Sequence, residues 1–200
     1  MSKRLLKLIF GIMLSSFSIT MVIHAQLGVF PITAMNISIA NMLGVSIGVS
    51  GMLVELVILA LAYKLGEGLS LTGIINATVG SLMIDFWDKI LPYHPLMILG
   101  ILLLPIAWYF SSSVGLGDTN QNLLTNAILK RTNKSMGFIR MCQEVLFVGI
   151  GFLGARNSIT LLTIVLSLGF GYVMQFEYKL LKYNPSKVKH SFLIKGKTNN

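Results

Sequence analysis

Long apolar segments alternate with short polar ones in this chain, and they predict membrane-spanning helices. No charged residue occurs between Lys7 and Glu55, and none between Lys89 and Asp118. A transmembrane helix needs roughly 20 mostly apolar residues to cross about 30 Å of hydrocarbon. We therefore expect six long helices, over residues 5–26, 46–65, 69–91, 95–114, 135–154 and 158–178.

Two shorter, amide-rich stretches lie between the long segments, at 29–43 (VFPITAMNISIANML) and 118–131 (DTNQNLLTNAILKR). Their apolar and polar residues recur at mixed three- and four-residue spacing, which predicts helices, and Pro31 suits a first helical turn. Helices of this length rise only about 22 Å, which is less than the thickness of the hydrocarbon core. The lengths favour two half-membrane or interfacial helices, with two further complete spans as the alternative.

The chain also repeats itself. Residues 26–56 align with residues 115–145 at a constant offset of 89, and glycine or polar identities at one offset are hard to obtain by chance. We therefore predict two homologous transmembrane repeats, 1–93 and 94–180, followed by a basic cytoplasmic tail, 181–200. The matched identities include Leu27 with Leu116, Gly28 with Gly117, Ser46 with Ser135, Gly48 with Gly137 and Glu55 with Glu144.

The number of spans in each half decides how the halves are related. Three spans are an odd number, so the second half would enter the membrane from the opposite side and form an inverted repeat. Four spans would give parallel repeats. Both arrangements place the termini and the cluster Lys130, Arg131 and Lys134 in the cytoplasm, and they differ only at Lys64 and Lys89.

Composition and charge agree with a membrane protein. Of the 200 residues, 54% are hydrophobic and 12% are charged, and the mean hydropathy is +0.76, whereas a soluble domain has about 25% charged residues. The net charge of +9 resides largely in segments that flank apolar spans, where positive residues stay cytoplasmic. No basic platform interleaved with aromatic residues occurs, so we expect the lipid bilayer as a partner and no nucleic acid.

The N-terminus resembles a signal peptide, because KRLLK precedes an apolar stretch and VIHAQ offers a small residue near a cleavage point. We expect no cleavage. The apolar run continues past Ala25, and the repeat makes this segment the counterpart of the fourth long segment.

Two glutamates stand where ionisation is most costly. Ser46 and Ser135 are predicted helix N-caps, and Glu55 and Glu144 follow nine residues later, about 13 Å along each helix. Both carboxyl groups therefore fall near the bilayer midplane. An ionisable residue at that depth costs several kcal/mol unless it faces the bundle interior and finds a partner.

The two copies differ in a basic neighbour. Arg140 lies four residues before Glu144 on the same helical face, so an intrahelical ion pair is possible, whereas Gly51 occupies the matching position before Glu55. One interpretation is a central polar site of Glu55, Glu144 and Arg140 that binds a substrate or a proton. The other is an interhelical polar lock that only fixes packing.

Amide side chains on the short stretches extend the candidate site, with Asn36 and Asn122 as the additional binding residues. A short helix could point its N-terminal N–H groups into a central cavity, as discontinuous transporter helices do. The alternative is an amphipathic helix lying at the membrane interface. The other polar residues on these stretches are Ser38, Asn41, Asn120, Gln121 and Asn126.

Enzyme chemistry has little support. Residues 48–51 read Gly-Val-Ser-Gly, a pattern found around the nucleophile of intramembrane serine proteases of the rhomboid type, but the second copy reads Gly-Phe-Ile-Arg. His24 and His94 are the candidate bases, and both fall near span ends. The histidines are too isolated for a metal site, and Cys142 is the single cysteine. We expect no enzyme activity, no metal and no cofactor.

The halves resemble the YczE/YyaS/YitT family of bacterial membrane proteins, and YczE most closely. The resemblance is carried by LGVFPITAMNISIANMLGVSIG and GLGDTNQNLLTNAILKRTNKSMG and covers residues 5–178. Members often have Gly-Pro-Trp-Asp after the first span, where this chain has VFPIT. The resemblance implies a multi-pass protein of the bacterial cytoplasmic membrane, from a family without an established activity.

Together these features predict an all-α transmembrane bundle of about six spans and two short half-membrane helices. We expect a permease-like transporter of a small molecule or ion with a central buried carboxylate site. The alternative is a non-transporting accessory or scaffold protein that assists or anchors a partner.

Overall fold

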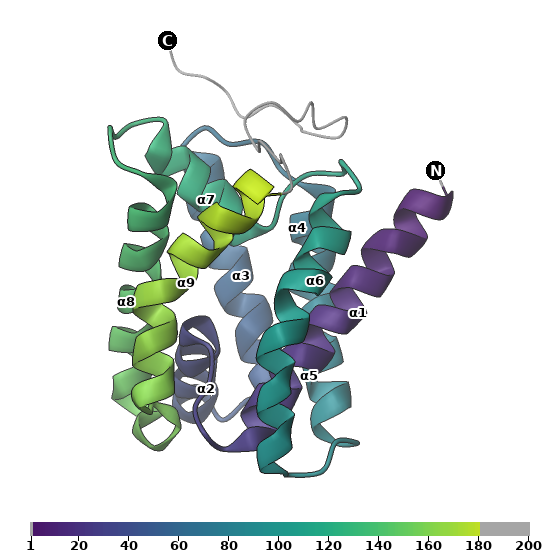
Figure 1. The fold of residues 1–200 in the computed structure, drawn as a ribbon, viewed down its shortest axis with the longest axis vertical. Helices are drawn as coiled ribbons and strands as arrows, with labels where there is room; N and C mark the ends of the chain where they lie inside the picture. Colours follow the sequence, from purple (N-terminus) through teal and green to yellow (C-terminus); the bar gives the residue numbers. More distant parts are fainter. Residues whose placement is uncertain (1, 181–200) are drawn as a thin grey trace.

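The long apolar segments form helices close to where the sequence predicts them. The computed structural model describes residues 2–180, so the expected basic tail, 181–200, lies outside the described residues. Every regular element in the described part is helical, which confirms the all-α prediction (Figure 1). Four helices match whole predicted segments: α1 (Ser2–Ala25), α3 (Ile47–Lys64), α8 (Met136–Gly154) and α9 (Leu161–Leu180).

The two other long segments form interrupted helices. Segment 69–91 becomes α4 (Leu71–Ile75), a π-helical turn (Asn76–Gly80) and α5 (Ser81–Asp88) in immediate succession. Segment 95–114 begins as a 3₁₀ turn, Pro95–Leu99, and continues as α6 (Gly100–Ser112). A π turn inside a helix locally disturbs the regular backbone hydrogen bonding and is frequent at functional sites.

The serine caps predicted from the repeat are present at α3 and α8. Ser46 Oγ accepts a hydrogen bond from the Val49 N–H at 3.2 Å, and Ser135 Oγ accepts one from the Phe138 N–H at 3.2 Å. These bonds satisfy N–H groups that have no partner inside the helix. The second long helix of each half therefore begins at the same position of the repeat.

The two short stretches form α2 (Pro31–Leu43) and α7 (Asn120–Leu129), each with a buried start and an exposed end. Residues 28–31 before and at the start of α2 are buried, whereas residues 41–46 at its end are exposed. Residues 116–118 before α7 are likewise buried, and residues 130–135 after it are exposed. Each short helix packs against the other half, because α2 contacts α8 and α7 contacts α3.

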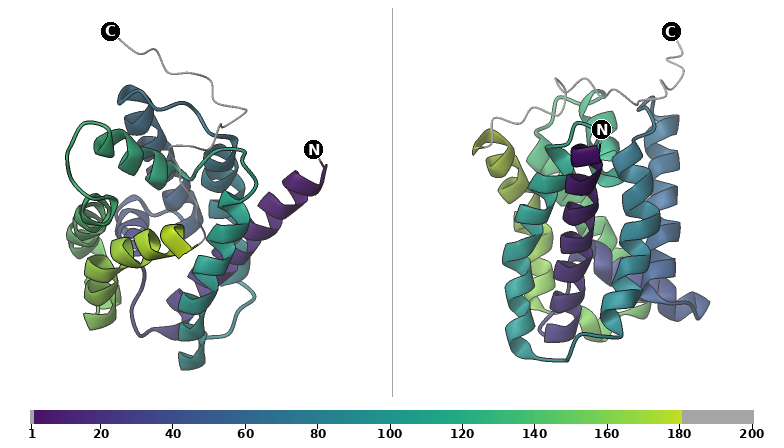
Figure 2. Two further views of the ribbon diagram at one scale, coloured as in Figure 1. Left: turned by 45° about the horizontal axis from the view of Figure 1, so that its top comes forward. Right: turned by 90° about the vertical axis from the view of Figure 1, so that its right-hand side faces the viewer.

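Long helices that follow one another along the chain run in opposite directions. In the view of Figure 1, α1 descends from the N-terminus, α3 rises, and α4 and α5 descend. In the second half α6 rises, α8 descends and α9 rises, and the turned views in Figure 2 agree. The short helices lie toward opposite ends, with α2 at the bottom and α7 at the top.

Small residues bring the helices close together. Gly151 of α8 lies against Ala34 of α2, and Gly154, also of α8, lies against Ser38 of α2. Ser38 Oγ also donates a hydrogen bond to the Ile150 carbonyl oxygen at 3.0 Å. Close contacts at small residues and interhelical hydrogen bonds are the main attractions between helices in lipid, where apolar side chains gain little by leaving the solvent.

Apolar side chains cover much of the outer surface. Three helices of the described part are long and apolar enough to cross a membrane, namely Lys3–Ala25, Ile47–Lys64 and Met136–Gly154. Pro95–Ser111 and Leu161–Val173 are shorter apolar helices. An exterior of this kind is unfavourable in water and is compatible with lipid. Exposed apolar residues include Leu53, Leu56, Val57, Val145, Leu146, Leu153, Leu161 and Val165.

Candidate functional site

The five residues that the sequence singled out line one cavity in the middle of the bundle. The cavity has an empty volume of about 860 Å³, including the space at its mouth, and α2, α3, α7 and α8 contribute polar side chains to it. Its polar wall includes Asn36, Glu55, Asn122, Arg140 and Glu144. All five of these side chains are buried.

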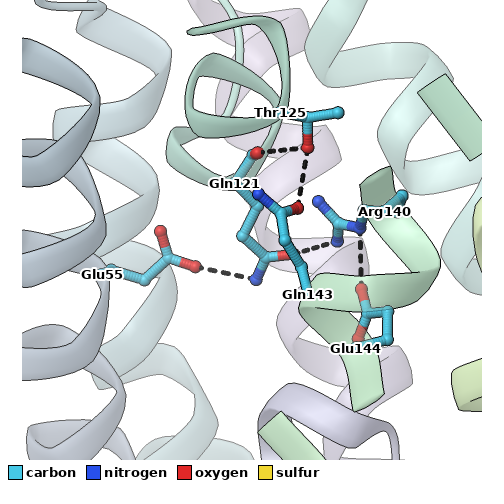
Figure 3. A network of polar contacts seen from close by, with 6 residues as sticks. All are labelled: Glu55, Gln121, Thr125, Arg140, Gln143 and Glu144. Carbon is cyan, nitrogen blue, oxygen red and sulfur yellow. Dashed lines mark hydrogen bonds and ion pairs between the residues drawn. The ribbon is translucent and has the colours of Figure 1, made fainter. Parts of the chain in front are cut away.

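A hydrogen-bonded chain connects the two glutamates across this cavity (Figure 3). Gln121 Nε2 donates to Glu55 Oε1 at 3.2 Å, and Arg140 Nη2 donates to Gln121 Oε1. Arg140 Nε then donates to Glu144 Oε1 at 2.7 Å, which forms the predicted intrahelical ion pair. The amide of Gln121 suits its position, because it offers a donor to the carboxylate and an acceptor to the guanidinium.

A second amide extends the chain on the α8 side. Gln143 Oε1 lies 2.8 Å from Thr125 Oγ1, which also lies 2.8 Å from the Gln121 carbonyl oxygen (Figure 3). The network therefore joins α3 to α8 through α7, and the six residues drawn in Figure 3 all come from these three helices. Glu55 is thus linked to Glu144 indirectly, through Gln121 and Arg140.

Three buried polar atoms at the cavity have no hydrogen-bond partner among the described residues: Glu55 Oε2, Asn36 Oδ1 and Arg140 Nη1. Their residues are 8%, 7% and 3% exposed. A buried polar group without a partner costs about 1–3 kcal/mol, and more when the group is charged. At a cavity such atoms can bond a ligand or water, so the three together define where a polar ligand would find partners.

The charges around the cavity are unequal. Among the described lining residues, Glu55 and Glu144 supply carboxyl groups and Arg140 supplies the guanidinium. Arg140 forms its ion pair with Glu144, whereas Glu55 has a hydrogen bond from a neutral amide. A positive group near Glu55 would therefore be favoured.

The starts of both short helices face the cavity. Residues 30–33 of the α2 start and Thr119, Gln121 and Asn122 at the α7 start all line it. The first N–H groups of a helix have no partner within the helix, and they carry a partial positive charge. Of the two arrangements left open by the sequence, the structure thus supports the one with helix starts at a central cavity.

The two helix starts differ in their own acidic groups. Asp118 Oδ1 accepts hydrogen bonds from the Thr119 N–H at 2.9 Å and from Asn122 Nδ2 at 2.8 Å. Position 29, which matches Asp118 in the repeat, is Val29, and the N-cap of α2 is Phe30, which makes no side-chain cap. The start of α2 therefore lacks the carboxylate that the start of α7 has.

Other polar residues of the short helices fix the packing between the halves. Asn120 Nδ2 donates to the Gly73 carbonyl oxygen at 3.1 Å, and Asn41 Nδ2 donates to the Gly154 carbonyl oxygen at 2.7 Å. These side chains were grouped with the candidate site in the sequence, but they bond backbone carbonyls at helix contacts.

Ser50 of the protease-like pattern and the candidate base His24 have different partners. Ser50 Oγ donates to the Asn36 carbonyl oxygen at 2.6 Å, where α2 meets α3. The His24 ring is buried, with Nε2 at 2.8 Å from Asp88 Oδ1 and the ring stacked on Tyr93.

The sequence missed an aromatic wall of the cavity. Phe30, Trp108 and Phe170 line it, and the Trp108 and Phe170 rings lie 5.1 Å apart between centroids. These residues come from the start of α2, from α6 and from α9, and each lies within an ordinary apolar run. No local pattern marks them, because their common orientation arises from helix packing.

Comparison with known proteins identifies a family but no activity. No curated protein and no solved structure matches the chain. The likeness to the YczE/YyaS/YitT family therefore stays a prediction. Residues 2–179 match DUF6198, a family of unknown function, and this extent includes every helix from α1 to α8 and all of α9 except its last residue. The chain belongs to the DUF6198 family of unknown function.

Proposed function

We propose that this protein is a small permease-like transporter of the bacterial cytoplasmic membrane. The observation that carries the proposal is the buried chain from Glu55 through Gln121 and Arg140 to Glu144, at a cavity that both short helices face. Secondary transporters often bind their substrates in this way, near the midplane and at the ends of discontinuous helices. The likeness is one of architecture, so the activity itself requires a test.

Six spans and two half-membrane helices form the proposed topology. The spans are α1, α3, α4 with α5, the 3₁₀ turn Pro95–Leu99 with α6, α8 and α9. In support, each short helix starts in the buried interior, ends at an exposed turn and is followed by a long helix from the same end. At 13 residues, α2 rises about 20 Å, which is too short to cross the hydrocarbon core.

An inverted repeat accounts for the directions of the helices. The counterparts α1 and α6, and likewise α3 and α8, run oppositely in Figure 1. The crossed contacts are also reciprocal, because α2 packs on α8 and α7 packs on α3. Gly28 and Gly117 match in the repeat, and both have positive φ, 135° and 110°.

The cytoplasmic side follows from the positive residues. Helices α3 and α7 both end at the side that holds the N-terminus. Lys64 is the last residue of α3, and the cluster Lys130, Arg131 and Lys134 follows α7. Lys89 follows α5 at the opposite end. Because positive residues favour the cytoplasm, we assign the end that holds the N-terminus and α7 to that side.

A polar lock between helices explains only part of the site. It accounts for the hydrogen bonds that join Gln121 of α7 to Glu55 of α3 and to Arg140 of α8. It does not account for Glu55 Oε2, Asn36 Oδ1 and Arg140 Nη1, which lack partners in the described part of the chain. A binding site explains both sets of atoms.

Accessibility of the cavity from the two sides tests the proposal without knowledge of the substrate. In a Cys142→Ala background, Ser16→Cys places a thiol on the cavity wall, since Ser16 lines the cavity. Ser18→Cys is the matched control, because Ser18 is buried two residues further and bonds the Gly100 carbonyl oxygen of α6 at 2.6 Å.

The thiols are treated with a small membrane-impermeant thiosulfonate in right-side-out and in inside-out vesicles. A transporter exposes its site alternately, so Ser16→Cys should react from both sides while Ser18→Cys stays protected. An accessory or scaffold protein needs no such exchange. Protection of Ser16→Cys from both sides, or reaction from one side only, contradicts the transporter proposal.

A further inference from the structure

We infer that the ligand of the central cavity is a small zwitterion with an apolar substituent, such as an apolar amino acid. This inference rests on the proposed function for its transport step, but its evidence is the chemistry of the cavity wall. That wall offers a site for a cationic group, a site for an anionic group and an apolar face, and each can be argued separately.

The cationic group of the ligand belongs beside Glu55. Glu55 Oε1 accepts from Gln121 at 3.2 Å, while Glu55 Oε2 and Asn36 Oδ1 are buried acceptors without partners in the described structure. An ammonium group has three N–H donors and a positive charge, so it satisfies both needs. Glu144 is less suited, because Arg140 already neutralises it at 2.7 Å.

The anionic group belongs between Arg140 and the start of α2. Arg140 uses Nε for Glu144 and Nη2 for Gln121, which leaves Nη1 buried and unpartnered among the described residues. The start of α2 lines the same cavity and has only the apolar N-cap Phe30. At the start of α7 the carboxylate of Asp118 accepts the Thr119 N–H. A ligand carboxylate could play the same role at the start of α2, the matching helix of the other repeat.

An aromatic wall receives the apolar part of the ligand. Phe30 and Phe170 lie 6.0 Å apart between ring centroids, and Trp108 packs edge-on against Phe170 at 5.1 Å. All three line the cavity, and none of them carries a charge. A bare inorganic ion would leave this wall without a contact, whereas an aliphatic or aromatic substituent would bury apolar surface there.

Ligands with a single charge fit less well. A simple cation would satisfy Glu55 and leave Arg140 Nη1 unpaired, and a simple anion would do the reverse. A zwitterion satisfies both without adding net charge to the cavity. The three features together therefore select one chemical class.

A matched set of probes tests this class on the purified full-length protein. L-Phenylalanine is compared with phenethylamine, which lacks the carboxylate, and with 3-phenylpropionate, which lacks the ammonium group. L-Leucine and L-valine are compared with isopentylamine and isobutylamine and with their matching acids. Binding is measured by the shift in Tm across a concentration series, and uptake is measured in liposomes.

At least one zwitterion should bind roughly tenfold or more tightly than both of its singly charged analogues, because each analogue leaves a buried polar atom of a charged group, Arg140 Nη1 or Glu55 Oε2, without a partner. Equal or tighter binding of the amine or of the acid overturns the inference, and so does the absence of a Tm shift with every zwitterion.

The variant Glu55→Gln tests whether Glu55 binds the ammonium group of the ligand. It should weaken zwitterion binding tenfold or more and should not weaken 3-phenylpropionate binding, because a negative charge is removed from the cavity. Glu67→Gln is the matched control, because Glu67 and Glu55 are each 8% exposed, but Glu67 pairs with Lys130 at 2.6 Å and does not line the cavity. If Glu55→Gln fails to fold, the probe series on the unaltered protein still decides the class.

The ligand test and the accessibility test fail separately. Zwitterion binding without alternating reactivity of Ser16→Cys would retain the ligand class and contradict transport. Alternating reactivity without zwitterion binding would retain transport and overturn the ligand class.

Discussion

Replacing Arg140 with methionine tests the energetics of the central network most directly. The Arg140 and Glu144 side chains are 3% and 2% exposed, so the pair is fully withdrawn from solvent. Arg140→Met keeps much of the side-chain volume but leaves the Glu144 carboxylate and Gln121 Oε1 without their donors. Removing one partner of a buried pair costs about 3–5 kcal/mol, because the other charge stays buried.

The double variant Arg140→Met/Glu144→Leu should be far less destabilised than Arg140→Met. Both charges are then absent, and replacing a buried pair by apolar residues is often neutral or stabilising. For a chain of this size, about 3–5 kcal/mol corresponds to a fall in Tm of about 6–20 °C. We expect such a fall for Arg140→Met, and a Tm within about 4 °C of the unaltered protein for the double variant.

The assay is thermal unfolding in detergent, followed by the fraction of protein that remains monodisperse on size exclusion, with unfolding in mixed micelles as a second measure. Arg156→Met is the matched control, since Arg156 is exposed and donates only to the Phe152 carbonyl oxygen at 3.2 Å. The reasoning is refuted if Arg140→Met and Arg156→Met are equally stable, or if the double variant is less stable than Arg140→Met.

Three further predictions concern the backbone and the topology. Gly28→Ala should cost about 1–3 kcal/mol of stability, because φ is 135° there and an added Cβ would meet Thr160 Oγ1. Gly149→Ala is the control and should not lower Tm, because an added Cβ at Gly149 has nothing within 4 Å. Asp85→Asn should cost about 1 kcal/mol in the same unfolding assay, because the Asp85 carboxylate accepts the Gly48 N–H at 2.7 Å at the start of α3; an unchanged Tm would contradict this role. In a background without Cys142, Lys64→Cys should react with an impermeant thiol reagent only from the cytoplasmic side and Lys89→Cys only from the opposite side, and equal sidedness would contradict the inverted repeat.

Local sequence predicted the helices and one part of the site. The apolar runs and the caps at Ser46 and Ser135 place α3 and α8 to within a residue or two, because both act over a single turn of chain. The Arg140–Glu144 pair was equally predictable, since a spacing of four residues puts the two side chains on one helical face.

The interruption of the third long segment was not predictable in the same way. Residues 69–91 read as one mostly apolar segment with polar residues scattered along it, yet the helix contains a π turn at Asn76–Gly80. Asn76 and Gly80 line the cavity at this turn. The sequence places polar residues at this turn but does not show that they border a cavity.

The bridge between the two glutamates depends on distant parts of the chain. Gln121 is one of several amides in its stretch, and only the packing of α7 between α3 and α8 places its side chain between Glu55 and Arg140. A different set of contacts, in which Trp108 of α6 and Phe170 of α9 pack with Phe30, places these rings at the cavity. Residue spacing along the chain contains no information about which amide or aromatic residue will face this cavity.

The chain's residue order thus defines helices, caps and the depth of the two carboxyl groups, because hydrophobic periodicity and hydrogen bonds within one turn are short-range. The cavity, its unpartnered atoms Glu55 Oε2 and Arg140 Nη1, and its aromatic wall arise from helices that meet across long sequence separations. Burial withdraws water from these groups, and it is burial that makes an unpartnered carboxylate oxygen or guanidinium N–H costly enough to indicate a ligand.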